Sequence, residues 1–95
     1  MTSIEPTEAE IVGRWIFDGR QNQADEACRR IEWLTNSVLH EVASSKESGG
    51  WDTLFRDPSD GRLWERTYPQ SEMHGGGPPR LAAVAEFEAR QRYDF

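Results

Sequence analysis

The chain has 95 residues, a length that fits one domain with a modest hydrophobic core. Hydrophobic residues make up 36% and charged residues 29%, which is typical of a globular protein and excludes a disordered one. The net charge of -6, from 17 acidic and 11 basic side chains, argues against binding of bare nucleic acid and favours a basic protein as the partner.

The single cysteine and the N-terminal residues bear on the compartment. Cys28 has no second cysteine to pair with, which fits a reducing environment. Residues 1–10 are acidic and lack the apolar run of a signal peptide, and no segment reaches the length of a membrane-spanning helix. We therefore expect a cytoplasmic protein without a membrane partner, with a loose N-terminal lead-in at residues 1–10 and a single domain at residues 11–95.

The first half of the chain predicts a hairpin followed by the main helix. Residues 11–18 alternate in polarity like a strand, and Asp18-Gly19 predicts a turn into a short second strand near residues 20–23. Asp25 is the expected N-cap of a helix that runs to about Ala43. Its apolar stripe, at about 100° per residue, consists of Cys28, Ile31, Leu34, Val38 and Val42. Because Cys28 lies on this stripe, we expect a buried, unreactive thiol.

The second half predicts more strands and a short final helix. Residues 51–56 and 62–68 are expected to pair as strands around the turn at residues 57–61, with arginine stems covering the aromatic rings of the second strand. Residues 70–79 form an expected irregular loop, followed by a short strand at 81–84 and a helix at 86–93. The predicted fold is α+β, with a small antiparallel β-sheet packed against one main helix, the loop folded over that helix, and a short C-terminal helix.

Motifs for catalysis or metal binding are weak in this sequence. Asp57 and Asp60 lack the spacing of a calcium loop and are expected to bond their own turn. The Gly/Pro run at residues 75–79 lacks the lysine and hydroxyl residue of a phosphate loop and is expected to fix the chain path. His74 beside Glu72 is a candidate acid–base pair, but nothing marks a nucleophile or an oxyanion site. We expect no catalytic residue, no metal and no cofactor.

Short motifs distributed along the chain carry a family resemblance. They are Gly13-Arg14-Trp15, Arg30-Ile31-Glu32-Trp33-Leu34, Gly50-Trp51, Asp57-Pro58-Ser59-Asp60-Gly61-Arg62 and Gly75-Gly76-Gly77-Pro78-Pro79. In this order and spacing, over about residues 11–93, the chain resembles the immunity protein 27 family of bacterial polymorphic toxin systems. Leu63 and Arg66 stand where the family pattern has an aromatic and an aliphatic residue, so their surroundings are expected to differ.

The resemblance implies an immunity protein, or antitoxin, that binds and neutralises a cognate toxin exchanged between competing bacteria. Such toxins often cleave nucleic acid, and the acidic surface would complement a basic nuclease-type cleft. We therefore expect inhibition by occlusion of the toxin's active site or substrate path. Two alternatives stay open: a small enzyme or ligand-binding domain that uses Glu72, His74 and Asp57, and a general protein-interaction adaptor.

Contact residues are predicted from expected exposure. Glu72 and His74 lie on an expected loop, and loops commonly carry contacts. Trp33 falls on the polar side of the helix. Its sequence position is explained equally well by contact with the toxin and by burial under another segment of the chain. The residues predicted to contact the toxin are Glu65, Glu72, His74, Asp52 and Trp33. The aromatic residues assigned instead to the core are Trp15, Trp51, Phe55, Trp64 and Tyr68.

Overall fold

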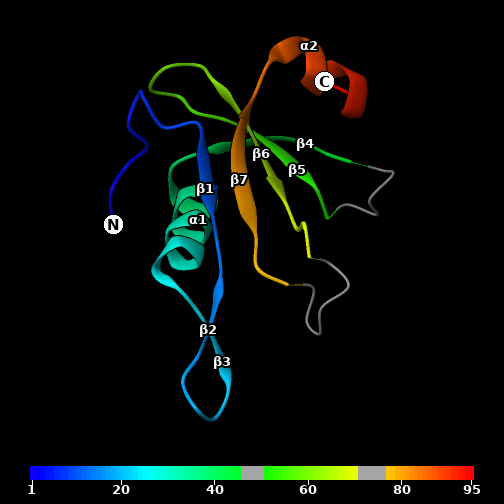
Figure 1. The fold of residues 1–95 in the computed structure, drawn as a ribbon. Coiled ribbons are helices and arrows are strands. Elements are labelled where there is room, and N and C mark those ends of the chain that lie inside the picture. Colours follow the sequence, from blue (N-terminus) through cyan, green and yellow to red (C-terminus); the bar gives the residue numbers. More distant parts are fainter. Residues whose placement is uncertain (46–50, 71–76) are drawn as a thin grey trace.

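The computed structural model describes residues 1–45, 51–70 and 77–95. Within them a five-stranded antiparallel sheet, in the order β1-β7-β6-β5-β4, lies beside a two-stranded hairpin of β2 and β3 (Figure 1). The elements are β1 (Glu10–Val12), β2 (Trp15–Phe17), β3 (Asn22–Ala24), α1 (Glu26–Ser37), β4 (His40–Ser44), β5 (Thr53–Arg56), β6 (Leu63–Thr67), β7 (Arg80–Val84) and α2 (Glu86–Arg92). The predicted α+β fold, with one main helix and a short C-terminal helix, is confirmed.

The single strand predicted over residues 11–18 is wrong, because the chain leaves the main sheet at Gly13. The Gly13 N–H donates to the Pro79 carbonyl oxygen at 2.9 Å, and a Cβ at this position would lie 2.6 Å from Cys28 Sγ. Beyond this point β2 pairs with β3 in the hairpin expected from Asp18-Gly19, with Gly19 at a φ of +95°. The hairpin extends away from the sheet and helix (Figure 1).

Helix α1 begins as predicted and ends earlier than predicted. Asp25 is its N-cap, with the side chain accepting from the Cys28 N–H at 2.8 Å. The helix ends at Ser37 and not near Ala43. The last turn is weak because Thr, Asn and Ser have low helix propensity, and the Thr35 hydroxyl bonds back to the Ile31 carbonyl oxygen at 2.9 Å.

The residues assigned to the end of that helix form strand β4 instead. This strand pairs with β5 along one edge of the sheet, and its register shifts between Glu41 and Ala43. Val42, at the shift, packs partly buried against the cluster that contains Leu54. The helical stripe is therefore correct at Ile31 and Leu34 and wrong at Val42.

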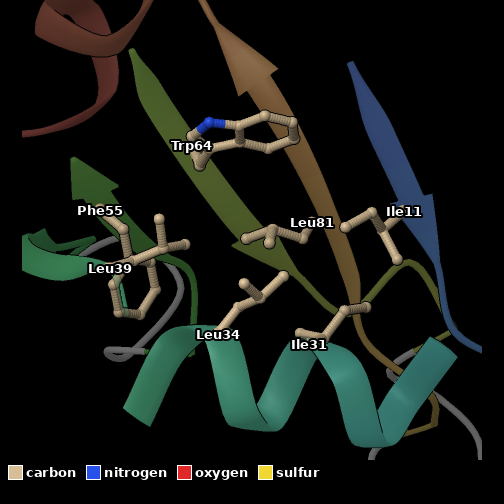
Figure 2. Packing of buried hydrophobic residues seen from close by; sticks show 7 residues of the cluster. All are labelled: Ile11, Ile31, Leu34, Leu39, Phe55, Trp64 and Leu81. Carbon is tan, nitrogen blue, oxygen red and sulfur yellow. The ribbon is translucent and has the colours of Figure 1, made fainter. Parts of the chain in front are cut away.

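The core lies between α1 and one face of the sheet. Ile31 and Leu34 of α1 point toward Trp64 and Leu81, with exposed fractions of 1% or less for all four side chains (Figure 2). Burying each such side chain stabilises the fold by about 1.5–3 kcal/mol. The predicted core positions of Phe55 and Trp64 are confirmed.

The opposite face of the sheet carries α2. Strand register places Leu54 and Glu65 side by side on this face, where Leu54 and Leu63 pack against Ala89 and Tyr93. The predicted strand and helix at the end of the chain are confirmed as β7 and α2.

Residues before β1 are held by arginine contacts. Arg30 of α1 donates to both carboxylate oxygens of Glu8, at 2.8 and 2.7 Å, and this pairing lowers the Glu8 pKa to about 2. Arg62 donates to the main-chain oxygens of Glu8 and Glu5. The segment is therefore tied to α1 and to the β5–β6 turn.

Candidate functional site

The acidic turn between β5 and β6 has a structural role. Asp57 Oδ1 accepts from the N–H and hydroxyl of Ser59 at 2.8 and 2.7 Å, and Asp60 accepts from the N–H and Nε of Arg62. The prediction that both carboxylates bond their own turn is confirmed. Within the described ranges, no group of three or more histidine, cysteine, aspartate or glutamate side chains is arranged to hold a metal ion.

The only cysteine is buried, as predicted. Its side chain is 6% exposed, and Sγ donates to the Arg14 carbonyl oxygen at 3.3 Å. Burial raises the pKa of the Cys28 thiol, and the Asp25 carboxylate beside it adds to the effect. The thiolate form needed for nucleophilic chemistry is thus disfavoured.

The four charged or polar residues predicted to contact the toxin differ in what the structure shows of them. Glu72 and His74 lie outside the described residues. Glu65 is engaged by α2: it accepts from Arg92 Nη2 at 2.9 Å and from the Tyr93 hydroxyl at 2.7 Å, and its side chain is 13% exposed. Asp52 is partly buried, and burial together with the nearby Glu65 charge raises its pKa.

Two tryptophans differ in how they are covered. Trp33 is partly buried and packs against the main core cluster, on the α1 side of the sheet. Glu65 lies on the opposite, α2 side, so the structure does not bring these two predicted contact residues together. Trp51 was predicted in the core, and this is wrong: it is 51% exposed and contacts Tyr68 edge-on, with ring centroids 5.5 Å apart. Trp51 precedes β5 and so lies outside the stretch whose residues pack between sheet and helix.

A pocket of about 350 Å³ opens between the base of the hairpin, α1 and the end of β6. Its wall combines aromatic, hydroxyl and amide groups with one arginine and one carboxylate, that of Glu32. The described residues that form it include Trp15, Thr35, Asn36, Arg66, Tyr68 and Pro79. Such a mixture of apolar surface and a few convergent polar groups is typical of a binding site.

Arg66 is one of the residues that line this pocket. Its guanidinium group is 5.3 Å from the centre of the Phe55 ring and 5.9 Å from that of Tyr68, which confirms that arginine stems cover aromatic rings on this face. Its Nη1 and Nη2 make long hydrogen bonds, 3.4 Å each, to the hydroxyls of Thr35 and Thr53. Its Nε is buried and has no acceptor in the described part of the protein.

Exposed apolar side chains continue from this pocket onto the hairpin. Phe17 is 68% exposed and lies on the same face of β2 as Trp15, a pocket residue, while Ile16 is 55% exposed on the other face. Large exposed hydrophobic groups beside a pocket that contains an arginine suit a protein contact. The described hairpin and pocket together therefore form a candidate binding surface.

Residues 17–85 of the chain match the model of the family Immunity protein 27. This match covers more than half of the chain, and the chain belongs to that family, as the motif order predicted. The family is one of immunity proteins. Searches of curated proteins and of solved structures return no match.

Phe17 and Arg66 were not among the contact residues predicted from the sequence. Phe17 was included in a strand expected to continue, and no local signal marks the departure of the hairpin from the sheet. Arg66 carried a signal, because it stands where the family pattern has an aliphatic residue. Its position beside Thr35 and Tyr68 becomes visible only when β6 is placed against α1.

Proposed function

We propose that this protein binds a cognate bacterial polymorphic toxin and neutralises it by covering the toxin's active site or substrate path. The observation that carries the proposal is the family match over residues 17–85. The protein would act in the cytoplasm of the producing cell, as a stoichiometric inhibitor and not as an enzyme.

The charge of the chain supports a basic toxin, such as one that cleaves nucleic acid. A net charge of -6 attracts a cationic cleft and speeds its encounter with the inhibitor. Exposed aromatic side chains such as Phe17 and Trp51 offer the large apolar contacts that dominate binding energy at protein interfaces. Both properties fit a protein whose activity is to bind another protein.

The contact residues predicted from the sequence remain part of this proposal. Glu72 and His74 are predicted to contribute polar contacts, and Trp33 an aromatic one. Asp52 and Glu65 would contribute negative charge near the C-terminal helix. Because Glu65 bonds Arg92 and Tyr93, any effect of changing it must be separated from an effect on stability.

The decisive experiment is protection of cells. The toxin domain encoded beside this gene would be expressed in a susceptible bacterium with and without this protein, and the purified pair would be tested for a one-to-one complex. We expect restored growth, complex formation and loss of the toxin's activity in vitro. A toxin that binds the protein yet stays fully active, or cells that are not protected, would overturn the proposal.

A further inference from the structure

We propose that the Arg66 pocket is a recognition site for a carboxylate side chain, aspartate or glutamate, of the toxin. This inference rests on the proposed function and names one contact within it. The juxtaposition that carries it is a partly buried guanidinium group that forms no ion pair with the described residues, set in a pocket lined by aromatic, hydroxyl and amide groups and by the exposed Glu32.

Arg66 differs from the other partly buried arginines, which are Arg30, Arg62 and Arg80, because each of those forms an ion pair with a carboxylate. Ion pairs with a carboxylate are formed in the described structure by Arg30, Arg62, Arg80, Arg90 and Arg92. Arg66 is less accessible than an ordinary surface arginine and forms no such pair with the described residues. Glu32 also lines the pocket but is exposed and is not within ion-pair distance of Arg66. An acidic protein therefore leaves one of its partly buried cations without a counter-charge.

Burial of an unpaired charge is unfavourable for the free protein. A guanidinium nitrogen that loses water without gaining an acceptor retains its desolvation penalty. The 3.4 Å bonds to Thr35 and Thr53 are longer than the usual 2.9–3.0 Å and recover little of that penalty. The arrangement is more easily explained by a partner than by stability.

The surroundings of Arg66 favour a carboxylate as that partner. The planar guanidinium group binds two oxygens of one carboxylate at once, and the partly dry pocket strengthens the charge-assisted bonds. The guanidinium group already lies over the rings of Phe55 and Tyr68, so we expect little side-chain freedom to be lost on binding. An acidic toxin side chain inserted here would be flanked by Trp15 and Tyr68.

The position of the pocket suits contact with a large partner. Phe17 and Trp15 share one face of the hairpin, and exposed Trp51 contacts Tyr68, which also lines the pocket. Aromatic groups that surround a desolvated arginine are the composition found at the centre of tight interfaces. The toxin would bury these rings while it inserts its carboxylate.

The test compares Arg66→Met with the wild-type protein. Methionine keeps an apolar stem over Phe55 and removes the charge. Measured by calorimetry against the purified toxin domain at one salt concentration, we expect binding to weaken by about 30-fold or more. Thermal stability should stay the same or rise, because the unpaired charge is gone. Arg66→Lys, which keeps the charge without the planar fork, should bind with intermediate affinity.

Arg56→Met is the matched control. Arg56 is exposed and lies at the opposite end of the β5–β6 pair, so this variant loses the same charge without touching the pocket. It should bind at least as well as wild type. If Arg66→Met binds within about threefold of wild type while the wild type protects cells, the pocket assignment is wrong and the proposed function stands. If the wild type neither binds nor protects, the proposed function itself fails.

A scan of the toxin provides the second arm, and the comparison with Arg66→Lys keeps it informative if Arg66→Met does not fold. Each exposed aspartate or glutamate of the toxin domain would be changed to asparagine or glutamine and tested against wild-type protein, Arg66→Lys and Arg66→Met. Changing one particular acidic residue should weaken binding strongly to the wild type, less to Arg66→Lys and little to Arg66→Met. Additive losses at every acidic position would refute the carboxylate contact.

Discussion

Gly13 has a role that no larger residue can fill. A Cβ added there would lie 2.6 Å from Cys28 Sγ and 2.7 Å from the Pro79 carbonyl oxygen. The carbonyl oxygen also accepts the Gly13 N–H, so it cannot move away without losing that bond. We expect Gly13→Ala to lower the free energy of unfolding by about 1–3 kcal/mol, measured by urea denaturation.

A double substitution separates the two clashes at Gly13. In a Cys28→Ala background, Gly13→Ala should lower the free energy of unfolding by less than it does in the wild-type protein. The clash with the sulfur is then absent, and only the clash with the Pro79 carbonyl oxygen remains. Gly19→Ala is a different case: nothing lies within 4 Å, and its strain comes only from a φ of +95°. An unchanged midpoint for Gly13→Ala would mean that the turn out of the sheet tolerates a side chain.

How well single residues could be predicted depends on how far away their partners are in the sequence. Asp25, Asp57 and Asp60 each bond a group two or three positions along the chain, and turn and cap chemistry predicted all three. Glu65 bonds Tyr93, which is 28 positions away. Its role in holding α2 was therefore not predictable, and an outward orientation was the natural interpretation.

At the scale of elements, prediction succeeded where one periodicity dominated and failed where two competed. The segment at residues 37–44 continues the apolar spacing of α1, yet its Val38 and Val42 also favour a strand. Pairing with β5 decides between them, and that pairing is a tertiary contact. Similarly, residues 11–18 alternate as one strand, and only the approach of Pro79 to Gly13 divides them. The pocket at Arg66 forms between such elements, so it could not be predicted.

Docking of α2 on the sheet is expected to depend on Glu65. This carboxylate accepts hydrogen bonds from Arg92 and from the Tyr93 hydroxyl. Burial of the Tyr93 side chain raises its pKa, and the hydrogen bond to Glu65 raises it further. We expect Glu65→Gln to lower the free energy of unfolding by about 1–2 kcal/mol, because the Arg92 contact loses its charge. It should also lower the pKa of Asp52, which the Glu65 charge helps to raise, and NMR titration measures this shift.

Glu88→Gln is the control for the α2 experiment. Glu88 is exposed on the same helix, so its change should leave the unfolding midpoint nearly unchanged. The same pair of variants separates the two roles considered for Glu65. If Glu65→Gln weakens toxin binding and leaves stability intact, Glu65 acts at the interface and the anchoring role is wrong.

At the scale of the whole molecule, charge and shape act on different steps of binding. A net charge of -6 produces a field that reaches beyond the surface, whereas the Arg66 pocket acts only after contact. We therefore expect the association rate with a basic toxin to fall at least about tenfold between 50 and 500 mM salt, as screening shortens the range of the field. Stopped-flow fluorescence, using the tryptophans, would measure it.

Two variants then assign the rates to their causes. Glu41→Gln combined with Glu88→Gln removes two exposed negative charges, and should slow association and leave dissociation nearly unchanged. Arg66→Met should mainly speed dissociation, because it removes a desolvated contact. It also makes the protein more acidic, so association with a basic toxin should not become slower. An association rate independent of salt would contradict the expected basic toxin surface. A dissociation rate unchanged in Arg66→Met would place the stabilising contacts elsewhere on the molecule.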